Sequence, residues 1–126
     1  MNKMNNQTLS HPISAQPGWL SVARATAMRH LADPQFGNER FARLLFLSPK
    51  TLSRRMLIAT GLTVNKYLLN LRLEEAKRRL DHHAGPPLTS LQLAQSIGFQ
   101  KASYFAGRFR DRYGVSPTEY QKHNRV

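Results

Sequence analysis

The stretch Leu47–Gly61, LSPKTLSRRMLIATG, marks both ends of a short helix. Ser48 is a preferred N-cap residue, Pro49 suits the first helical position, and Gly61 suits the left-handed residue that follows a helix. Between these ends the stretch carries no acidic residue and three cations, namely Lys50, Arg54 and Arg55. A solvated helix face usually mixes charges of both signs, so this one-sided charge indicates a surface that meets phosphate.

The composition of the whole chain agrees with this interpretation. The 126 residues include 19 Lys and Arg against 7 Asp and Glu, which gives a net charge of +12 and a pI of about 11.2. So basic a chain favours a polyanionic partner, with nucleic acid ahead of an anionic membrane surface. Two segments, 49–60 and 100–113, carry a net charge of +3 each and so hold half of the total.

Several other classes of function are disfavoured. The chain has no cysteine, which excludes disulfides, thiolate metal sites and cysteine nucleophiles. Its histidines are scattered, and we find no paired carboxylates and no Gly-rich phosphate loop, so we expect no catalytic residue, no metal site and no cofactor. No apolar run approaches the roughly 18 residues that a membrane span needs, so we expect a cytoplasmic protein that does not bind membranes.

After a polar stretch at residues 1–18, which we expect to be a disordered tail, the sequence predicts helices separated by short breaks. Strand signals are absent, since no sustained alternation of polar and apolar residues occurs. Caps and apolar periodicity predict seven helices, with Asn38, Ser48 and Thr63 as N-caps of the second, third and fourth. Their expected ranges are 19–32, 39–45, 49–60 and 64–80, then one from Thr89 or Ser90 to 97, one ending at 113 and one opening at 116–117.

The fourth helix carries two apolar stripes rather than one. The stripes lie roughly 140° apart, at 100° per residue. One consists of Val64, Tyr67, Leu68 and Leu71, and the other of Leu69, Leu73, Ala76 and Leu80. A helix that packs on one core needs only one stripe. We therefore expect this helix to bridge two lobes.

The two lobes also repeat each other. At an offset of 52 the matching pairs are Phe41 and Leu93, Ala42 and Ala94, Leu45 and Ile97, and Leu47 and Phe99. At an offset of 53 they are Leu52 and Phe105, Met56 and Phe109, Gly61 and Gly114, Thr63 and Ser116, and Tyr67 and Tyr120. In each copy a short helix, a tight turn and a basic helix follow one another, which is the order of a helix-turn-helix unit.

These features together predict an all-α fold in which two helix-turn-helix lobes are joined by a long bridging helix. The expected parts are a tail at 1–18, a first lobe at 19–62, the bridging helix at 63–81 and a second lobe at 82–126. In such units the second helix enters the major groove and contacts base edges with its outward side chains. The helix 49–60 and its repeat, which ends at 113, are the candidate recognition helices.

On the first recognition helix, apolar Leu52 and Met56 point into the lobe. The opposite face consists of Lys50, Ser53, Arg54 and Leu57. Arg54 suits base contact best, because its guanidinium can pair with both O6 and N7 of guanine. Arg55 lies to the side of this face, where a phosphate contact is more natural.

On the second recognition helix the equivalent outward face carries small side chains. It consists of Ser103, Ala106, Gly107 and Arg110. We expect Tyr104, Phe105 and Phe109 to lie in the core, and we expect phosphate contacts from the cations Lys101, Arg108, Arg110 and Arg112. This helix therefore offers few groups for base contact.

The segment Gly98–Gln121, GFQKASYFAGRFRDRYGVSPTEYQ, is similar to the signature of the AraC/XylS family of bacterial transcription regulators. The segment LSPKTLSRRM matches the family as well, and the resemblance extends from about Trp19 to Tyr120. It implies a transcription regulator, usually an activator, that places two recognition helices in successive major grooves of double-stranded DNA. It also implies a contact with RNA polymerase. The short chain suggests a compact, stand-alone type that binds as a monomer.

Three positions depart from the family pattern. Gly107 replaces a usual Arg, Gln121 replaces a frequent Arg, and Phe46 occupies a turn position that is often Gly. The first departure weakens base contact by the second recognition helix, and it supports an alternative. In that alternative the chain is an interaction protein with reduced operator recognition that acts through RNA polymerase or another regulator.

Overall fold

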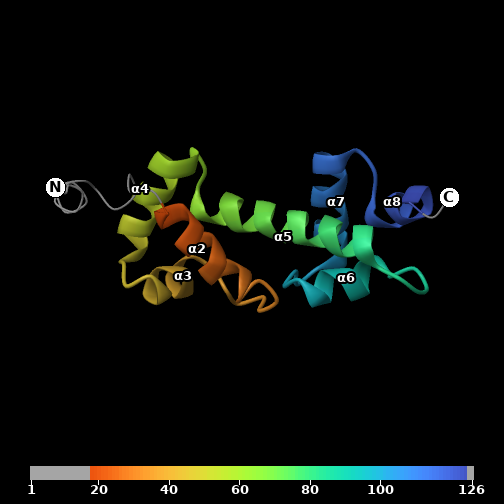
Figure 1. Ribbon diagram of the computed structural model, residues 1–126, viewed down its shortest axis with the longest axis horizontal. Helices are drawn as coiled ribbons and strands as arrows, with labels where there is room; N and C mark the ends of the chain where they lie inside the picture. The colour runs from red at the N-terminus through yellow and green to blue at the C-terminus, as the bar shows by residue number, and fades with distance from the viewer. Residues whose placement is uncertain (1–17, 125–126) are drawn as a thin grey trace. The chain divides into compact units, whose positions relative to one another are not determined.

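The computed structural model describes residues 18–124, in which seven helices follow one another and no strand occurs. Figure 1 shows α2 (Trp19–Met28), α3 (Asn38–Leu44), α4 (Pro49–Thr60), α5 (Val64–His82), α6 (Ser90–Ser96), α7 (Ala102–Tyr113) and α8 (Pro117–Asn124). The all-α class expected from the sequence is confirmed. Residues 1–17 of the expected tail lie outside the described residues.

Local capping chemistry sets most of the helix ends. The Ser48 hydroxyl accepts a hydrogen bond from the backbone N–H of Thr51 at 3.1 Å, and Gly61 ends α4 with φ +77°. Thr89 and Gln92 form a reciprocal capping box at the start of α6. Gly114 ends α7 with φ +87°. These ends were predictable because the capping residues lie next to the helices that they close.

Two predicted ends are wrong. α2 ends at Met28 rather than at residue 32, and the turn that follows is held from far along the chain. Arg72 donates from Nε to the Leu31 carbonyl at 3.1 Å and from Nη2 to the Asp33 carbonyl at 3.0 Å. Asn38 is not an N-cap but the first residue of α3, after extended Gly37, and its Oδ1 is buried without a hydrogen-bond partner.

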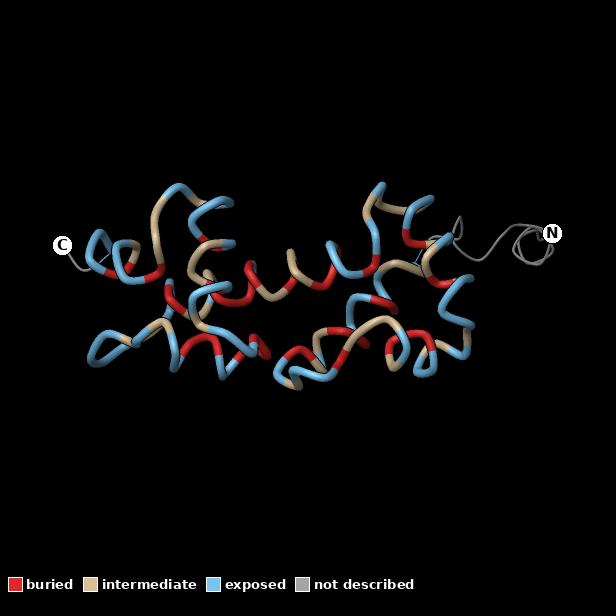
Figure 2. Tube along the Cα trace, turned by 180° about the vertical axis from the view of Figure 1, so that it is seen from behind, coloured by how far each residue is buried: buried red, intermediate tan, exposed pale blue. Residues whose placement is uncertain are grey.

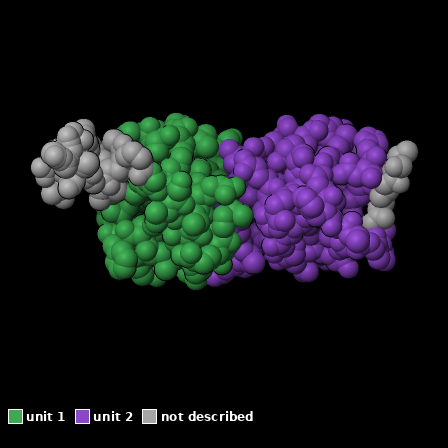
Figure 3. Space-filling model, in the orientation of Figure 1, with its two compact units in different colours: residues 1–30, 36–68 green, residues 31–35, 69–126 purple. Residues whose placement is uncertain are grey.

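The described residues form two compact units (Figure 3). Unit 1 contains residues 18–30 and 36–68, and unit 2 contains residues 31–35 and 69–124. The boundary lies inside α5, between Leu68 and Leu69. The short segment 31–35 belongs to unit 2 although it follows α2, because Arg72 binds its carbonyl groups.

Each unit has its own buried residues (Figure 2). In unit 1 Phe36 and Phe41 are buried beside each other, and the half-buried ring of His30 stacks on Phe36. The core of unit 2 comprises Leu73, Ala76, Leu80, Leu93, Ala94, Ile97, Phe99, Phe105 and Phe109. The second stripe of α5 thus packs in unit 2, as predicted. Of the first stripe, Val64, Tyr67 and Leu68 are buried residues of unit 1, whereas buried Leu71 lies beyond the boundary.

The repeat found in the sequence is present in the backbone of both turns. The N–H groups of Leu45 and Leu47 both donate to the Ala42 carbonyl, at 3.0 and 2.9 Å. Those of Ile97 and Phe99 both donate to the Ala94 carbonyl, at 3.3 and 2.9 Å. The residue inside each turn has positive φ, +60° at Phe46 and +90° at Gly98. Each unit therefore contains the same helix-turn-helix backbone.

Candidate nucleic-acid interface

α4 presents the predicted cationic face to solvent. Leu52 and Met56 are fully buried, which fixes the rotation of the helix. Lys50, Arg54 and Leu57 are exposed on the opposite side, and Ser53 and Arg55 are half-buried. The structure thus brings together the five residues expected on and beside the first recognition surface.

The cations of α4 have no intramolecular partner among residues 18–124. Neither an ion pair nor a hydrogen bond engages the side chain of Lys50, Arg54 or Arg55 in that part of the chain. Unpaired cations on one helix face repel one another and gain from a bound anion. An external polyanion would therefore find these groups free.

α7 buries its aromatic side less completely than predicted. Phe105 and Phe109 are fully buried, but Tyr104 is 53% exposed, so its assignment to the core is wrong. Its ring lies 6.2 Å from that of Phe99, and the Arg108 guanidinium lies 5.7 Å from its centroid. Tyr104 stays outside because it lies about 100° round the helix from Phe105.

The outward face of α7 is small and open. Ser103 and Arg110 are exposed, whereas Ala106 and Gly107 are half-buried. A Cβ placed on Gly107 would meet no atom within 4 Å, so no neighbour requires glycine there. On the outward face predicted for α7, the exposed polar side chains are therefore those of Ser103 and Arg110.

Most cations of α7 have acidic neighbours, which distinguishes them from those of α4. Arg108 pairs with Asp111 at 2.5 Å, and Arg112 pairs with Glu74 of α5 at 2.8 Å. The pKa of Glu119 is lowered by its hydrogen bonds with Ser116 and by the positive charge of Arg110. Lys101, the residue before α7, is exposed, and its side chain has no partner among the described residues.

The buried carboxylate of Glu75 on α5 supports the helix that precedes the second turn. Glu75 accepts two hydrogen bonds from Arg78, at 2.9 and 2.7 Å, and one from Arg79 at 2.9 Å. Arg79 also donates to the carbonyl of Ser96, the last residue of α6, at 3.0 Å. The hydrogen bonds from Arg78 lower the pKa of Glu75 to about 2 against the opposing effect of burial. Glu75 thereby fixes the end of α6 just before the turn to α7.

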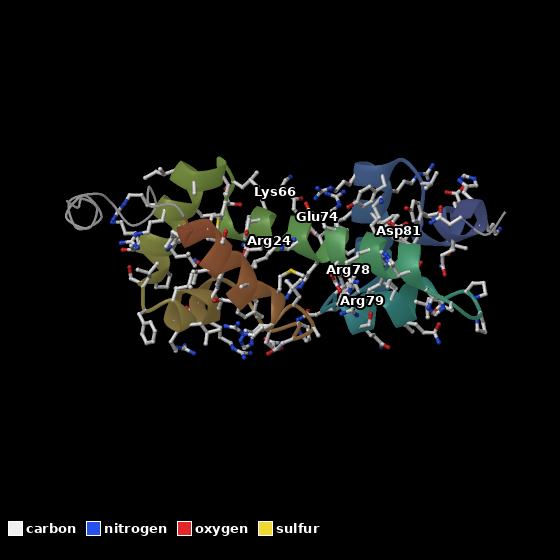
Figure 4. All side chains as sticks on the ribbon, viewed as in Figure 1. Arg24, Lys66, Glu74, Arg78, Arg79 and Asp81 are labelled. Carbon is white, nitrogen blue, oxygen red and sulfur yellow. The ribbon has the colours of Figure 1, made fainter. Side chains whose placement is uncertain are left out.

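The sequence analysis did not identify several residues that hold or accompany the cations of the candidate interface. Glu74 and Glu75 hold Arg112 and Arg79, and Arg72 holds the segment 31–35, but these partners are distant in sequence or carry no motif. Arg24 of α2 and Lys66 in the first turn of α5 are further exposed cations of unit 1 (Figure 4). Single surface cations give no local signal.

Two further findings limit the kinds of site present. Among residues 18–124 no group of three His, Cys, Asp or Glu side chains is placed to hold a metal ion. No helix in the same range is long and apolar enough to cross a membrane.

The sequence matches known regulators over most of its length. Residues 41–123 match the family described as a helix-turn-helix domain. The chain is 37% identical over 106 residues to the HTH-type transcriptional activator RhaS of Escherichia fergusonii, which covers 82% of this chain and 34% of that protein. It is 26% identical over 96 residues to the activator RhaR of Salmonella dublin, with coverage of 76% and 33%. The chain thus spans about a third of the length of these curated relatives.

Solved structures show the same fold. The DNA-binding domain of AdpA, a global transcriptional factor crystallised with a target DNA, is similar with a TM-score of 0.73 and 29% identity, over 84% of this chain and 92% of that one. A DNA-binding transcriptional dual regulator from Escherichia coli K-12 is similar with a TM-score of 0.74 and 26% identity, over 88% and 96%.

Proposed function

Because the chain belongs to the AraC/XylS family of helix-turn-helix proteins, we propose that it regulates transcription by binding specific sequences of double-stranded DNA. The observation that carries the proposal is the outward face of α4. The side chains of the three cations on and beside this face have no partner among the described residues, while the opposite side of the helix is fixed by fully buried Leu52 and Met56. A rigid helix with free cations has the properties of a major-groove recognition helix.

In the proposed complex the two basic helices have different contacts. Arg54 contacts a guanine edge, with Lys50 at a neighbouring base or phosphate, and Arg55 contacts the backbone. α7 enters a successive major groove, about one helical turn away, and binds mainly phosphate through Lys101 and Arg110. Arg108 and Arg112 can join only by exchanging Asp111 and Glu74 for phosphate. Neither helix supplies a catalytic residue, a metal or a cofactor.

We also propose a sign of regulation and a protein partner. RhaS and RhaR are named transcriptional activators, which supports activation by this chain. RNA polymerase is the partner that the family resemblance implies. We also propose that the chain acts in the cytoplasm and binds as a monomer, since it already carries two helix-turn-helix units. Asymmetric operators would then be expected, because a monomer imposes no two-fold symmetry on its site.

Selection of bound duplexes from a random pool, followed by salt titration of the winning sequence, tests the proposal. Six phosphate contacts would give a slope of about −5 in a plot of log affinity against log salt concentration, at roughly −0.9 per contact. No sequence enrichment and a nearly flat salt dependence would reject DNA binding. Capture of RNA polymerase without any DNA preference would favour the interaction-protein alternative.

A further inference from the structure

α4 exposes two large aliphatic side chains in an otherwise cationic helix. Leu57 is 49% exposed and Ile58 is 66% exposed. The positions that match them in α7, at the offset of 53, are Arg110 and Asp111, and both are exposed and charged. The second unit therefore carries solvated groups at the positions where the first keeps apolar ones.

Leu57 lies on the same line of the helix as the base-contacting residues. Residues at i, i+4 and i+7 share one face of an α-helix, and Lys50, Arg54 and Leu57 have that spacing. From Arg54 to Leu57 the axis rises about 4.5 Å, close to the roughly 3.4 Å between successive base pairs. Ile58 lies about 100° further round the helix, at the edge of this face.

Only one group in the major groove suits an apolar side chain. Each base pair presents hydrogen-bond donors and acceptors there, and thymine alone adds a methyl group at C5. Leucine cannot hydrogen-bond a base edge or neutralise a phosphate. It can, however, bury a methyl group and gain the free energy of removing both surfaces from water.

We propose that Leu57 recognises the methyl group of a thymine in the base pair next to the one that Arg54 contacts. This inference rests on the proposed function and adds a specificity-determining residue to it. The first half-site then contains a guanine, specified by Arg54, and an adjacent thymine, specified by Leu57, which lies about one α-helical turn after Arg54 on α4. No equivalent thymine is specified under α7, whose matching residue is Arg110.

The test is a pair of selections with the full chain from random duplex pools that differ only in one methyl group. One pool contains thymine, and the other contains uracil at every thymine position. In the thymine pool we expect the wild-type protein to enrich guanine at one position and thymine at its neighbour. In the uracil pool the guanine preference should remain. The enrichment of uracil at the neighbouring position should be about fourfold lower than that of thymine in the first pool, which is the effect of one buried methyl group.

Two variants make the result specific to Leu57. Leu57→Ala should lose the thymine preference in the first pool and bind both pools alike, with the guanine preference unchanged. Ile58→Ala is the matched control, since it removes a neighbouring exposed aliphatic group and should retain the difference between the pools. Both changes leave buried residues untouched, so folding is preserved.

The outcomes separate this inference from the function on which it rests. Enrichment of one motif with equal strength in both pools would overturn the role of Leu57 and leave DNA recognition intact. Loss of the thymine preference in Ile58→Ala rather than Leu57→Ala would also overturn it. No enrichment of any sequence from either pool would reject the proposed function, and this inference with it.

Discussion

The two helix-turn-helix units have turns with the same hydrogen-bond pattern, yet the residue inside one turn is exposed and the residue inside the other is closely packed. Phe46 has φ +60°, and its side chain is 95% exposed. Gly98 has φ +90°, and a Cβ there would lie 2.0 Å from the Leu31 carbonyl oxygen. The same turn thus tolerates a bulky residue where nothing packs against it and requires glycine where a second segment does.

The basic helices that follow the turns differ in the same way. The cations of α4 have no partners among the described residues, whereas Arg108 and Arg112 of α7 pair with acidic side chains. Two arginines of α7 thus contribute to the structure of unit 2, whereas the side chains of Lys50, Arg54 and Arg55 contribute no ion pair within the described residues. Two copies of one helix-turn-helix unit can therefore differ in how their basic helices are paired with acidic side chains, although their turns have the same hydrogen bonds.

The largest expected effect is that of Gly98→Ala. The new Cβ would clash with the Leu31 carbonyl, which cannot retreat easily because Arg72 binds it, and the left-handed conformation adds strain. We expect a loss of about 3–5 kcal/mol in the free energy of unfolding, measured by urea titration. Gly114→Ala, with φ +87° and no atom within 4 Å of its Cβ, should cost only the conformational part. Equal losses would mean that the Leu31 contact is unimportant.

Next in size is the loss of base contact in Arg54→Ala. We expect about 1–3 kcal/mol weaker binding to the selected DNA and relaxed specificity at one base pair. Arg55→Ala should weaken selected and scrambled duplexes alike, because phosphates carry no sequence. Binding isotherms on both duplexes measure the difference. A uniform loss for Arg54→Ala would remove the distinction between the two arginines.

An effect of intermediate size is expected for Glu75, whose hydrogen-bond partners Arg78 and Arg79 both lie in unit 2. Its pKa is lowered from 4.5 to about 2 in the folded protein, so the stabilisation is complete above pH 4.5 and is lost as the pH falls toward 2. Glu75→Gln should cost about 2 kcal/mol at neutral pH and flatten this acid dependence. Segment-resolved amide exchange should show the loss in α6 and α7. Equal loss of protection in α3 and α4 would contradict a role confined to unit 2.

Gly107→Arg should give α7 an arginine at the position that matches Arg54 of α4. The site is open, so the side chain can extend outward, and we expect about 1 kcal/mol tighter binding with a new guanine preference. The measurement is a base-by-base substitution profile of both proteins. Gly107→Ala is the control, since it removes the flexibility of glycine in the helix without adding a donor. Equal discrimination at both half-sites by the wild type would refute the asymmetry.

The smallest effect is a gain. Phe46→Gly should relieve the left-handed strain of a bulky residue and stabilise unit 1 by about 1 kcal/mol, because no packing is lost at so exposed a side chain. Thermal unfolding, with amide exchange assigned to unit 1, measures it. Phe46→Ala retains a Cβ and should give little gain. A destabilised Phe46→Gly variant would show that the phenyl ring has a structural contact of its own.

Much of the fold was predictable because its determinants are local. Ser48, Thr63, Thr89, Gly61 and Gly114 lie beside the helix ends that they mark, and each end was found. The outward faces of α4 and α7 followed from apolar spacing, since one face of each helix must be buried. Two predictions were wrong. The end of α2 was misplaced because the turn after it is held by Arg72, which is distant in sequence. Asn38 was predicted as an N-cap, but it is the first residue of α3, after Gly37.

The sequence by itself determined the helices, the repeat, the two stripes of α5 and, apart from Tyr104, the sides of α4 and α7 that meet solvent. These properties depend on periodicity and on capping residues within a few positions of one another. Only the tertiary structure decided which cations meet partners from distant parts of the chain. Arg112 meets Glu74 across 38 residues, and Arg79 reaches the Ser96 carbonyl from another helix. In the folded protein, acidic side chains pair with two arginines of α7, whereas the three cations of α4 have no acidic partner among the described residues.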